Sequence, residues 1–257
     1  MLLAIDSGNT NVVFAVFDGD RSVGVWRCAN NPKRTSDEYA VWLTQLMGLS
    51  GLAPSDIHAV IVASVVPEAQ FNLIKLCERY FPGDLLVVGS PQVDLPLQVL
   101  VDRPDQVGAD RLVNTVAAYN RFGGNLIIVD FGTATTFDIV NADGAYVGGV
   151  IAPGINLSIE ALYMAAAQLP RVAVRRPDKV IGKATVPAMQ SGVFWGYVGM
   201  IEGLVERIRK EYGDPLQVLA TGGLAPLFAE ATDVIGAIDS DMTVRGLLEI
   251  YRHNRSA

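Results

Sequence analysis

The sequence predicts an α/β protein built from two related subdomains, residues 1–120 and 121–257. The first observation is an internal repeat, in which residues 2–26 align without a gap on residues 126–150. This alignment places Asp6 on Asp130 and Gly8 on Gly132. The second observation is that apolar segments of strand length alternate with segments of helical periodicity along the chain. A self-similarity of this length indicates duplicated structural units, so both halves are expected to share one fold.

Each copy of the repeat predicts three consecutive strands. An apolar strand is followed by Asp-x-Gly with Asn or Thr, a second apolar strand, a tight turn written DGD or ADG, and a third strand. Short apolar runs bounded by such turns are typical of antiparallel hairpins. Two unrelated hairpins can also look alike, and that alternative stays open at this point.

The remaining segments predict helices and further strands. A helix is expected over residues 35–48, because Thr35 and Glu38 have the spacing of a capping box and Gly48 ends the segment. Apolar periodicity before Gly123-Gly124 predicts another helix over residues 110–122. Further strands are expected at 58–67, 85–89 and 217–223. Further helices are expected from the end of the 58–67 strand to about residue 80, over 156–169 and over about 186–212.

Composition directs the search toward a small-molecule ligand. The formal net charge is −7 and the pI is near 4.8, which argues against a nucleic-acid partner because that affinity rests on Lys and Arg. Two cysteines without CxxC spacing and two histidines argue against a disulfide framework and a zinc site. No basic segment precedes the N-terminal apolar residues and no apolar run reaches about 18 residues, so we expect a cytoplasmic protein without a membrane contact.

Three glycine-rich turns that follow strands are candidate phosphate-binding turns: DSGNTN at 6–11, DFGTATT at 130–136 and ATGG at 220–223. Backbone N–H groups at such turns form a concavity for anions, although one turn alone would be weak evidence. The P-loop pattern GxxxxGK[ST] does not occur, and no GxGxxG follows a strand, so a site of another kind is expected. Two facing copies would bring Asp6 and Asp130 to opposite walls of one cleft, because open α/β sheets bind ligands at strand carboxyl ends.

This combination resembles the superfamily of acetate kinase, sugar kinases, Hsp70 and actin, and more narrowly the type III pantothenate kinases over essentially the whole chain. The resemblance implies two duplicated ribonuclease-H-like subdomains that flank a nucleotide cleft. The segments that carry it, in order, are DSGNTN at 6–11, SVVP at 64–67, PDQVGADR at 104–111, DFGTATTFD at 130–138, GGVIAPG at 148–154, IGKATVPAMQSG at 181–192 and TGG at 221–223.

The resemblance implies an enzyme that uses ATP with Mg²⁺ to phosphorylate pantothenate to 4'-phosphopantothenate, the first step of coenzyme A biosynthesis. It places Asp6 near the divalent metal and assigns Asp130 to a monovalent cation, potassium (K⁺) or ammonium (NH₄⁺). The ATP-binding residues it implies are Asp6, Ser7, Gly8, Asn9, Thr10, Asn11, Val12, Val13, Thr133, Gly222 and Gly223.

The same resemblance makes Asp110 the general base on the substrate hydroxyl and Arg111 the partner of the substrate carboxylate. Without it, Asp110 would be an ordinary acidic residue in the first turn of a helix, where the dipole favours it. Many relatives carry Tyr where this chain has Val101, so that wall of the pocket is expected to differ. The substrate-binding residues implied are Gly108, Ala109, Asp110, Arg111, Thr185 and Val101.

Four glycines of the long helical segment, Gly192, Gly196, Gly199 and Gly203, fall on one helix face. Because glycine inside a helix costs about 1 kcal/mol relative to alanine, a close helix approach is the expected compensation. That approach is either packing within the chain or the two-fold interface of a homodimer, which the resemblance favours. It would place Thr185 beside the partner's Asp110.

Two other functions stay open at this point. A non-catalytic regulator is one, since some relatives look like accessory factors for transcription. Another enzyme on the same fold, such as an acid-sugar kinase or a phosphohydrolase, is the second, because fold does not fix function.

Overall fold

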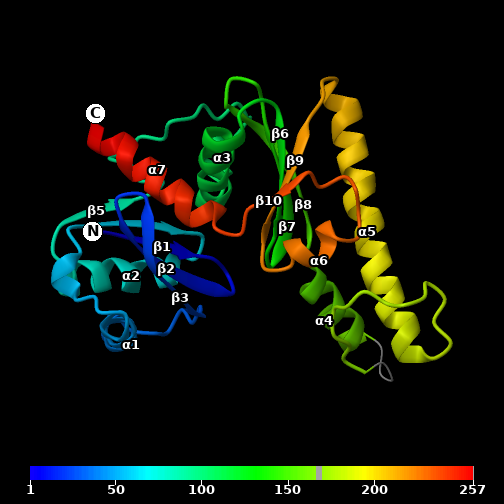
Figure 1. The fold of residues 1–257 in the computed structure, drawn as a ribbon, viewed down its shortest axis with the longest axis horizontal. Coiled ribbons are helices and arrows are strands. Elements are labelled where there is room, and N and C mark those ends of the chain that lie inside the picture. The colour runs from blue at the N-terminus through cyan, green and yellow to red at the C-terminus, as the bar shows by residue number, and fades with distance from the viewer. Residues whose placement is uncertain (166–169, 257) are drawn as a thin grey trace. The chain divides into compact units, whose positions relative to one another are not determined.

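A computed structural model describes residues 1–165 and 170–256 (Figure 1). The chain forms two compact units, each with helices packed on a sheet, which confirms the α/β class. The first unit comprises Met1–Gln98, Asp102–Arg121 and Asp241–Ala257, and the second comprises Val99–Val101 and Phe122–Ser240.

The sheet of the first unit has five strands in the order β3-β2-β1-β4-β5. The central strand β1 runs antiparallel to β2 on one side and parallel to β4 on the other. Its core positions are Leu2 to Ile5, all at most 4% exposed. The strands are β1 (Leu2–Ser7), β2 (Asn11–Asp18), β3 (Arg21–Ala29), β4 (Ala59–Ser64) and β5 (Asp84–Val87).

Helices cover both faces of this sheet. Figure 1 shows α1 (Ser36–Leu49) and α2 (Pro67–Tyr80) on one side, where their apolar residues share a cluster with alternate residues of β1, β2 and β4. The opposite face packs on α3 (Ala109–Phe122) and α7 (Met242–Ser256). The expected capping box at the start of α1 is present, since Thr35 N–H donates to Glu38 Oε2 (2.7 Å) and Glu38 N–H donates to Thr35 Oγ1 (3.3 Å).

The second unit has a five-stranded sheet in the order β10-β9-β6-β7-β8, with α4 (Ile155–Ala165), α5 (Thr185–Tyr212) and α6 (Ala225–Ala229) packed on it through one cluster. Residues 156–169 were expected to be helical, and 166–169 of that segment lie outside the described residues. The strands are β6 (Leu126–Phe131), β7 (Ala134–Val140), β8 (Tyr146–Pro153), β9 (Gln217–Gly222) and β10 (Ala237–Ile238).

The two sheets are copies of one topology. Counted from the outer hairpin strand, the orders β3-β2-β1-β4-β5 and β8-β7-β6-β9-β10 place corresponding strands in corresponding positions. The central strands also share one burial pattern, in which the fifth residue, Asp6 or Asp130, is the half-buried one among buried neighbours. The duplication inferred from the repeat, and with it the ribonuclease-H-like architecture, is therefore confirmed.

The compact units break after Arg121, next to the expected boundary at residue 120, but the first unit also includes Asp241–Ala257 and the second also includes Val99–Val101. The helix α7 belongs to the first unit, where Val244, Leu247 and Ile250 enter the cluster that contains α3. The approach is close, because a Cβ added at Gly246 would lie 2.2 Å from the carbonyl oxygen of Val113. Such a return of the chain terminus to the first unit depends on long-range packing, which the repeat does not reveal.

Within the described residues, no helix combines the length and apolar character that crossing a bilayer would need.

Candidate functional site

The first candidate turn joins β1 to β2 in the first unit. Ser7 is fully buried and pairs with Val12, whereas Asn9 and Thr10 are exposed. The N–H of Gly8 donates to the carbonyl oxygen of Asn11 (3.0 Å) and closes the turn. The expected phosphate turn is therefore a short exposed loop, and it is followed by β2, which begins with Asn11, Val12 and Val13.

The second candidate turn joins β6 to β7 in the second unit and is one residue shorter than the first. Gly132 N–H donates to the carbonyl oxygen of Ala134 (3.0 Å), and Thr133 is exposed. The carbonyl oxygen of Thr133 also accepts from Gly154 N–H (3.1 Å), directly after β8. A Cβ at Gly154 would lie 2.2 Å from that oxygen, so only glycine permits this approach.

The third turn lies beside Asp130. Gly222 ends β9 and pairs with Phe131, with a φ of 91° that side chains rarely adopt. A Cβ there would lie 2.6 Å from the carbonyl oxygen of Phe131 and 2.8 Å from Asp130 Oδ1. The structure therefore brings Asp130 and Gly222 together, with Gly223 exposed next to them.

Asp110 occupies the first turn of α3, close to the end of β1. Its Oδ1 accepts from the N–H of Arg111 (2.8 Å) and stands 2.6 Å from where a Cβ of Gly108 would be. Val65 Cγ1 lies 3.6 Å from the same point, and Val65 N–H donates to the carbonyl oxygen of Ser7 (3.1 Å). The carboxylate of Asp110 thus lies near Val65, in the connection between β4 and α2, and Val65 is hydrogen-bonded to the end of β1.

Burial raises the pKa of Asp110 above that of an ordinary carboxyl, while the N–H and the charge of Arg111 act in the opposite direction. A raised proton affinity suits a carboxylate that removes a proton during a reaction. A side chain at position 108 would clash with this carboxylate, so glycine there permits the position of Asp110. Gly108, Ala109, Asp110 and Arg111 therefore form one local arrangement at the start of α3.

Two predicted substrate residues belong to the second unit. Val101 ends the short segment Val99–Val101, where Leu100 N–H donates to the carbonyl oxygen of Tyr146 (2.8 Å). Thr185 is the first residue of α5 and is exposed. The start of α3, by contrast, belongs to the first unit.

The residues described here hold no preformed metal cage. No group of three or more His, Cys, Asp or Glu side chains is arranged to hold an ion anywhere in residues 1–165 and 170–256.

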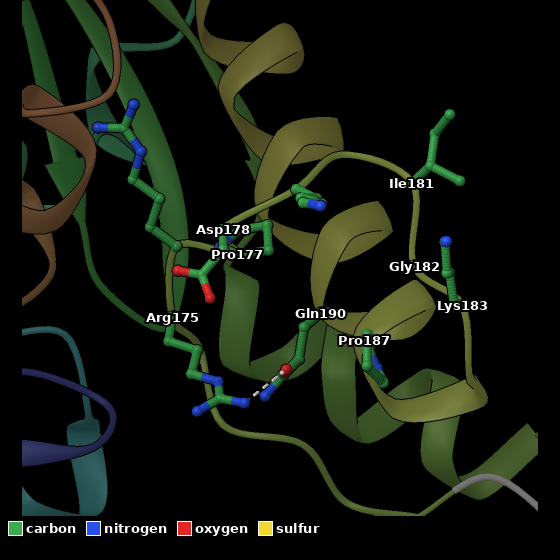
Figure 2. A pocket seen from close by; sticks show the side chains of 10 residues that line it. Arg175, Pro177, Asp178, Ile181, Gly182, Lys183, Pro187 and Gln190 are labelled. Atoms are coloured by element: carbon green, nitrogen blue, oxygen red, sulfur yellow. Dashed lines mark hydrogen bonds between the residues drawn. The ribbon is translucent and has the colours of Figure 1, made fainter.

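A cavity of about 420 Å³ lies between α5 and the chain that precedes it (Figure 2). Arg175 Nη2 donates to Gln190 Oε1 (3.1 Å) across its edge, and Lys183 lies on the other side. None of the predicted site residues lines it, although Thr185 follows Lys183 by two positions. Its cationic side chains are exposed, so we assign it no part in the chemistry.

Sequence reasoning missed two residues at the turns. Asn30 donates through its side chain to the first turn, and Gly154 approaches the second. The repeat offset pairs these two positions, but they lie beyond the aligned segment and differ in residue type. Gly154 ends the segment GGVIAPG that carries the resemblance, whereas none of the quoted motifs contains Asn30.

Comparison with known proteins gives a family. The family model described as type III pantothenate kinase matches residues 2–207. A type III pantothenate kinase of Paramagnetospirillum magneticum is 66% identical over 254 residues, which cover 99% of this chain and 98% of the relative. One from Rhodospirillum rubrum is 65% identical and covers 99% of both chains.

Solved structures show the same fold at low identity. A Campylobacter jejuni protein described as a Baf family transcriptional activator has a TM-score of 0.63 at 18% identity and covers 99% of this chain and 100% of its own. A Sinorhizobium meliloti protein described as a 2-dehydro-3-deoxygalactonokinase has a TM-score of 0.62 at 14% identity and covers 98% and 96%. At such identities these likenesses establish the fold and no activity.

We predict that Asp110→Asn raises the free energy of unfolding at pH 7, and that the gain disappears near about pH 3. Because the folded-state pKa of Asp110 is raised by burial, its ionised form destabilises the folded chain. This cost appears as the pH rises through the folded-state pKa and is fully present at neutral pH. Urea unfolding of both proteins at the two pH values measures it.

Asp105→Asn is the matched control. Asp105 is exposed, and the hydrogen bond from Arg103 lowers its pKa, so its ionised form is favoured and the amide should bring no gain at pH 7. Equal or lower stability of Asp110→Asn at pH 7 would contradict the burial argument.

Proposed function

Because this chain belongs to the type III pantothenate kinase family, we propose that it transfers the γ-phosphoryl group of ATP to pantothenate, giving 4'-phosphopantothenate and ADP. This is the first step of coenzyme A biosynthesis. The observation that carries the proposal within the chain is Asp110, a carboxylate with raised pKa that lies beside the end of β1.

In the proposed reaction, Asp110 accepts the proton of the primary hydroxyl of pantothenate, and the oxygen of that hydroxyl bonds to the γ-phosphorus of ATP. The bond from that phosphorus to the bridging oxygen breaks, and ADP leaves. Phosphoryl transfer depends mainly on positioning of the reactants and neutralisation of the phosphate charge. One carboxylate that accepts the proton is therefore enough acid–base catalysis for this reaction. Arg111, next in the chain, would bind the carboxylate of pantothenate through its guanidinium fork.

The turn from Asp6 to Val13 would hold the ATP phosphates through its backbone N–H groups and small polar side chains. Asp6 would hold the divalent ion, Mg²⁺, together with phosphate oxygens. Bound there, magnesium would neutralise phosphate charge. The further residues proposed to contact ATP are Thr133, Gly222 and Gly223. Those proposed to contact pantothenate are Gly108, Ala109, Thr185 and Val101.

Asp130 would bind the monovalent cation, potassium or ammonium. Two oxygens support this assignment, since Asp130 Oδ1 and the carbonyl oxygen of Phe131 both lie within 3 Å of the position that a Cβ of Gly222 would fill. Carboxylate and carbonyl oxygens are the ligands that such hard cations prefer. Two oxygens of this kind therefore lie close together beside Gly222.

We further propose that the enzyme is a homodimer that associates through α5. A Cβ at Gly192, Gly196 or Gly199 would meet no atom within 4 Å, and all three glycines are exposed. Packing within the described chain therefore does not account for this glycine face. Large apolar side chains are also exposed on the second unit, among them Ile181 (82%) and Met164 (77%).

We predict pantothenate-dependent ADP formation in a coupled assay with ATP and Mg²⁺, low with sodium alone and higher with potassium or ammonium. Asp110→Asn should lose about 100-fold or more of the rate, the usual contribution of a general base, and still bind ATP. Asp105→Asn changes an exposed carboxylate of the same segment and should keep a near wild-type rate.

The absence of pantothenate-dependent turnover with every cation would contradict the kinase assignment and favour a regulator. Turnover with acid sugars in place of pantothenate would favour another kinase on this fold. A near wild-type rate of Asp110→Asn would remove Asp110 from the role of base.

For the dimer, sedimentation should give twice the 27.5 kDa mass of the chain, and Gly199→Trp should give the monomer. Gly48→Trp is the control, because Gly48 is an exposed helical glycine of α1 that also meets nothing within 4 Å. A monomeric wild type, or a dimeric Gly199→Trp variant, would rule out this interface.

A further inference from the structure

Asn30 is the first residue after β3, and it forms hydrogen bonds with residues at the start and in the middle of the turn that follows β1. Its Nδ2 donates to the carbonyl oxygen of Gly8 (2.6 Å) and to Ser7 Oγ (3.3 Å). Its backbone N–H donates to the carbonyl oxygen of Thr10 (2.8 Å). One residue thus fixes the entrance and the middle of this turn.

The orientation of the Asn30 amide follows from these partners. The carbonyl oxygen of Gly8 can only accept, so the amide must present Nδ2 to it. The other amide atom, Oδ1, is buried and has no hydrogen-bond partner in the described part of the chain. A buried polar atom without a partner is uncommon, and such local costs gather at functional sites.

The corresponding turn of the second unit is held in another way. The position equivalent to Asn30 in the repeat is Gly154, whose backbone N–H donates to the carbonyl oxygen of Thr133. No side chain fits there, since a Cβ would lie 2.2 Å from that oxygen. Both copies therefore keep the backbone bond, and only the first copy adds a side-chain clamp.

We propose that Asn30 is a positioning residue for ATP, which it serves by holding the phosphate turn in its binding conformation; this rests on the proposed function. With the carbonyls of Gly8 and Thr10 fixed by Asn30, the turn does not have to be ordered when ATP binds. Preorganisation of this kind increases affinity because it lowers the entropy lost on binding. The turn assigned to the monovalent cation carries no such side-chain clamp.

The test compares Asn30→Ala with Asn31→Ala. Asn31 is the adjacent, exposed asparagine, and its Oδ1 accepts from Lys33 N–H (3.0 Å), which lies outside the turn. Calorimetric titration with MgATP, without pantothenate, gives the Kd. Steady-state kinetics then give KM and kcat for both substrates.

Asn30→Ala should raise the Kd and the KM of ATP about tenfold, the size expected for two lost hydrogen bonds, with a smaller change in kcat. The KM of pantothenate should stay within twofold, and Asn31→Ala should match the wild type. A purely structural defect would lower the active fraction and kcat without this selective change in ATP affinity. If Asn30→Ala does not fold, Asn30→Asp keeps the size, removes the donor, and should weaken ATP binding at least as much.

An ATP Kd within twofold of wild type in the folded variant would overturn the role of Asn30 and leave the kinase assignment intact. A shifted Kd in a protein without pantothenate-dependent turnover would support the role of Asn30 and overturn the kinase assignment. No binding of ATP by the wild type would overturn both.

Discussion

Strand pairing around β1 and β6 determines where the proposed site residues lie. Each of these strands has an antiparallel neighbour on one side and a parallel neighbour on the other, and its apolar residues are buried on both faces of the sheet. A carboxylate cannot be placed in such a strand except near its end, where Asp6 and Asp130 lie. The hairpin turn then has to follow at once, so the acidic residue and the glycine turn stay together.

The same hairpin can serve two purposes because its surroundings differ between the copies. Beside the end of β1, the parallel strand contributes Ser64, and the residue after β3 contributes the amide of Asn30. Beside the end of β6, the corresponding positions are Gly222 and Gly154, whose lack of a side chain lets the carbonyl oxygens of Phe131 and Thr133 approach closely. We propose that this difference lets the first turn hold the phosphates of ATP and the second a monovalent cation.

Much of this arrangement could be predicted from the sequence, because it is local. The capping box of α1 and the position of Asp110 in the first turn of α3 depend on residues within a few positions of each other. The repeat can be seen because each copy carries its strands and turns in one continuous segment. The position of α7 and the contacts of Asn30 and Gly222 depend on residues brought together by folding. Local patterns are silent on these, since an asparagine after a strand or a glycine at its end has many uses.

The central claim is that the Asp6 turn holds ATP with its divalent ion, whereas the Asp130 turn binds the monovalent cation. Its most direct test is the pantothenate kinase rate of wild type, Asp6→Asn and Asp130→Asn, titrated with potassium at saturating MgATP and with magnesium at saturating potassium. The account predicts that Asp130→Asn loses the response to potassium and keeps that to magnesium, and that Asp6→Asn does the reverse. A wild-type potassium response in Asp130→Asn, or the same change in both variants, would contradict it.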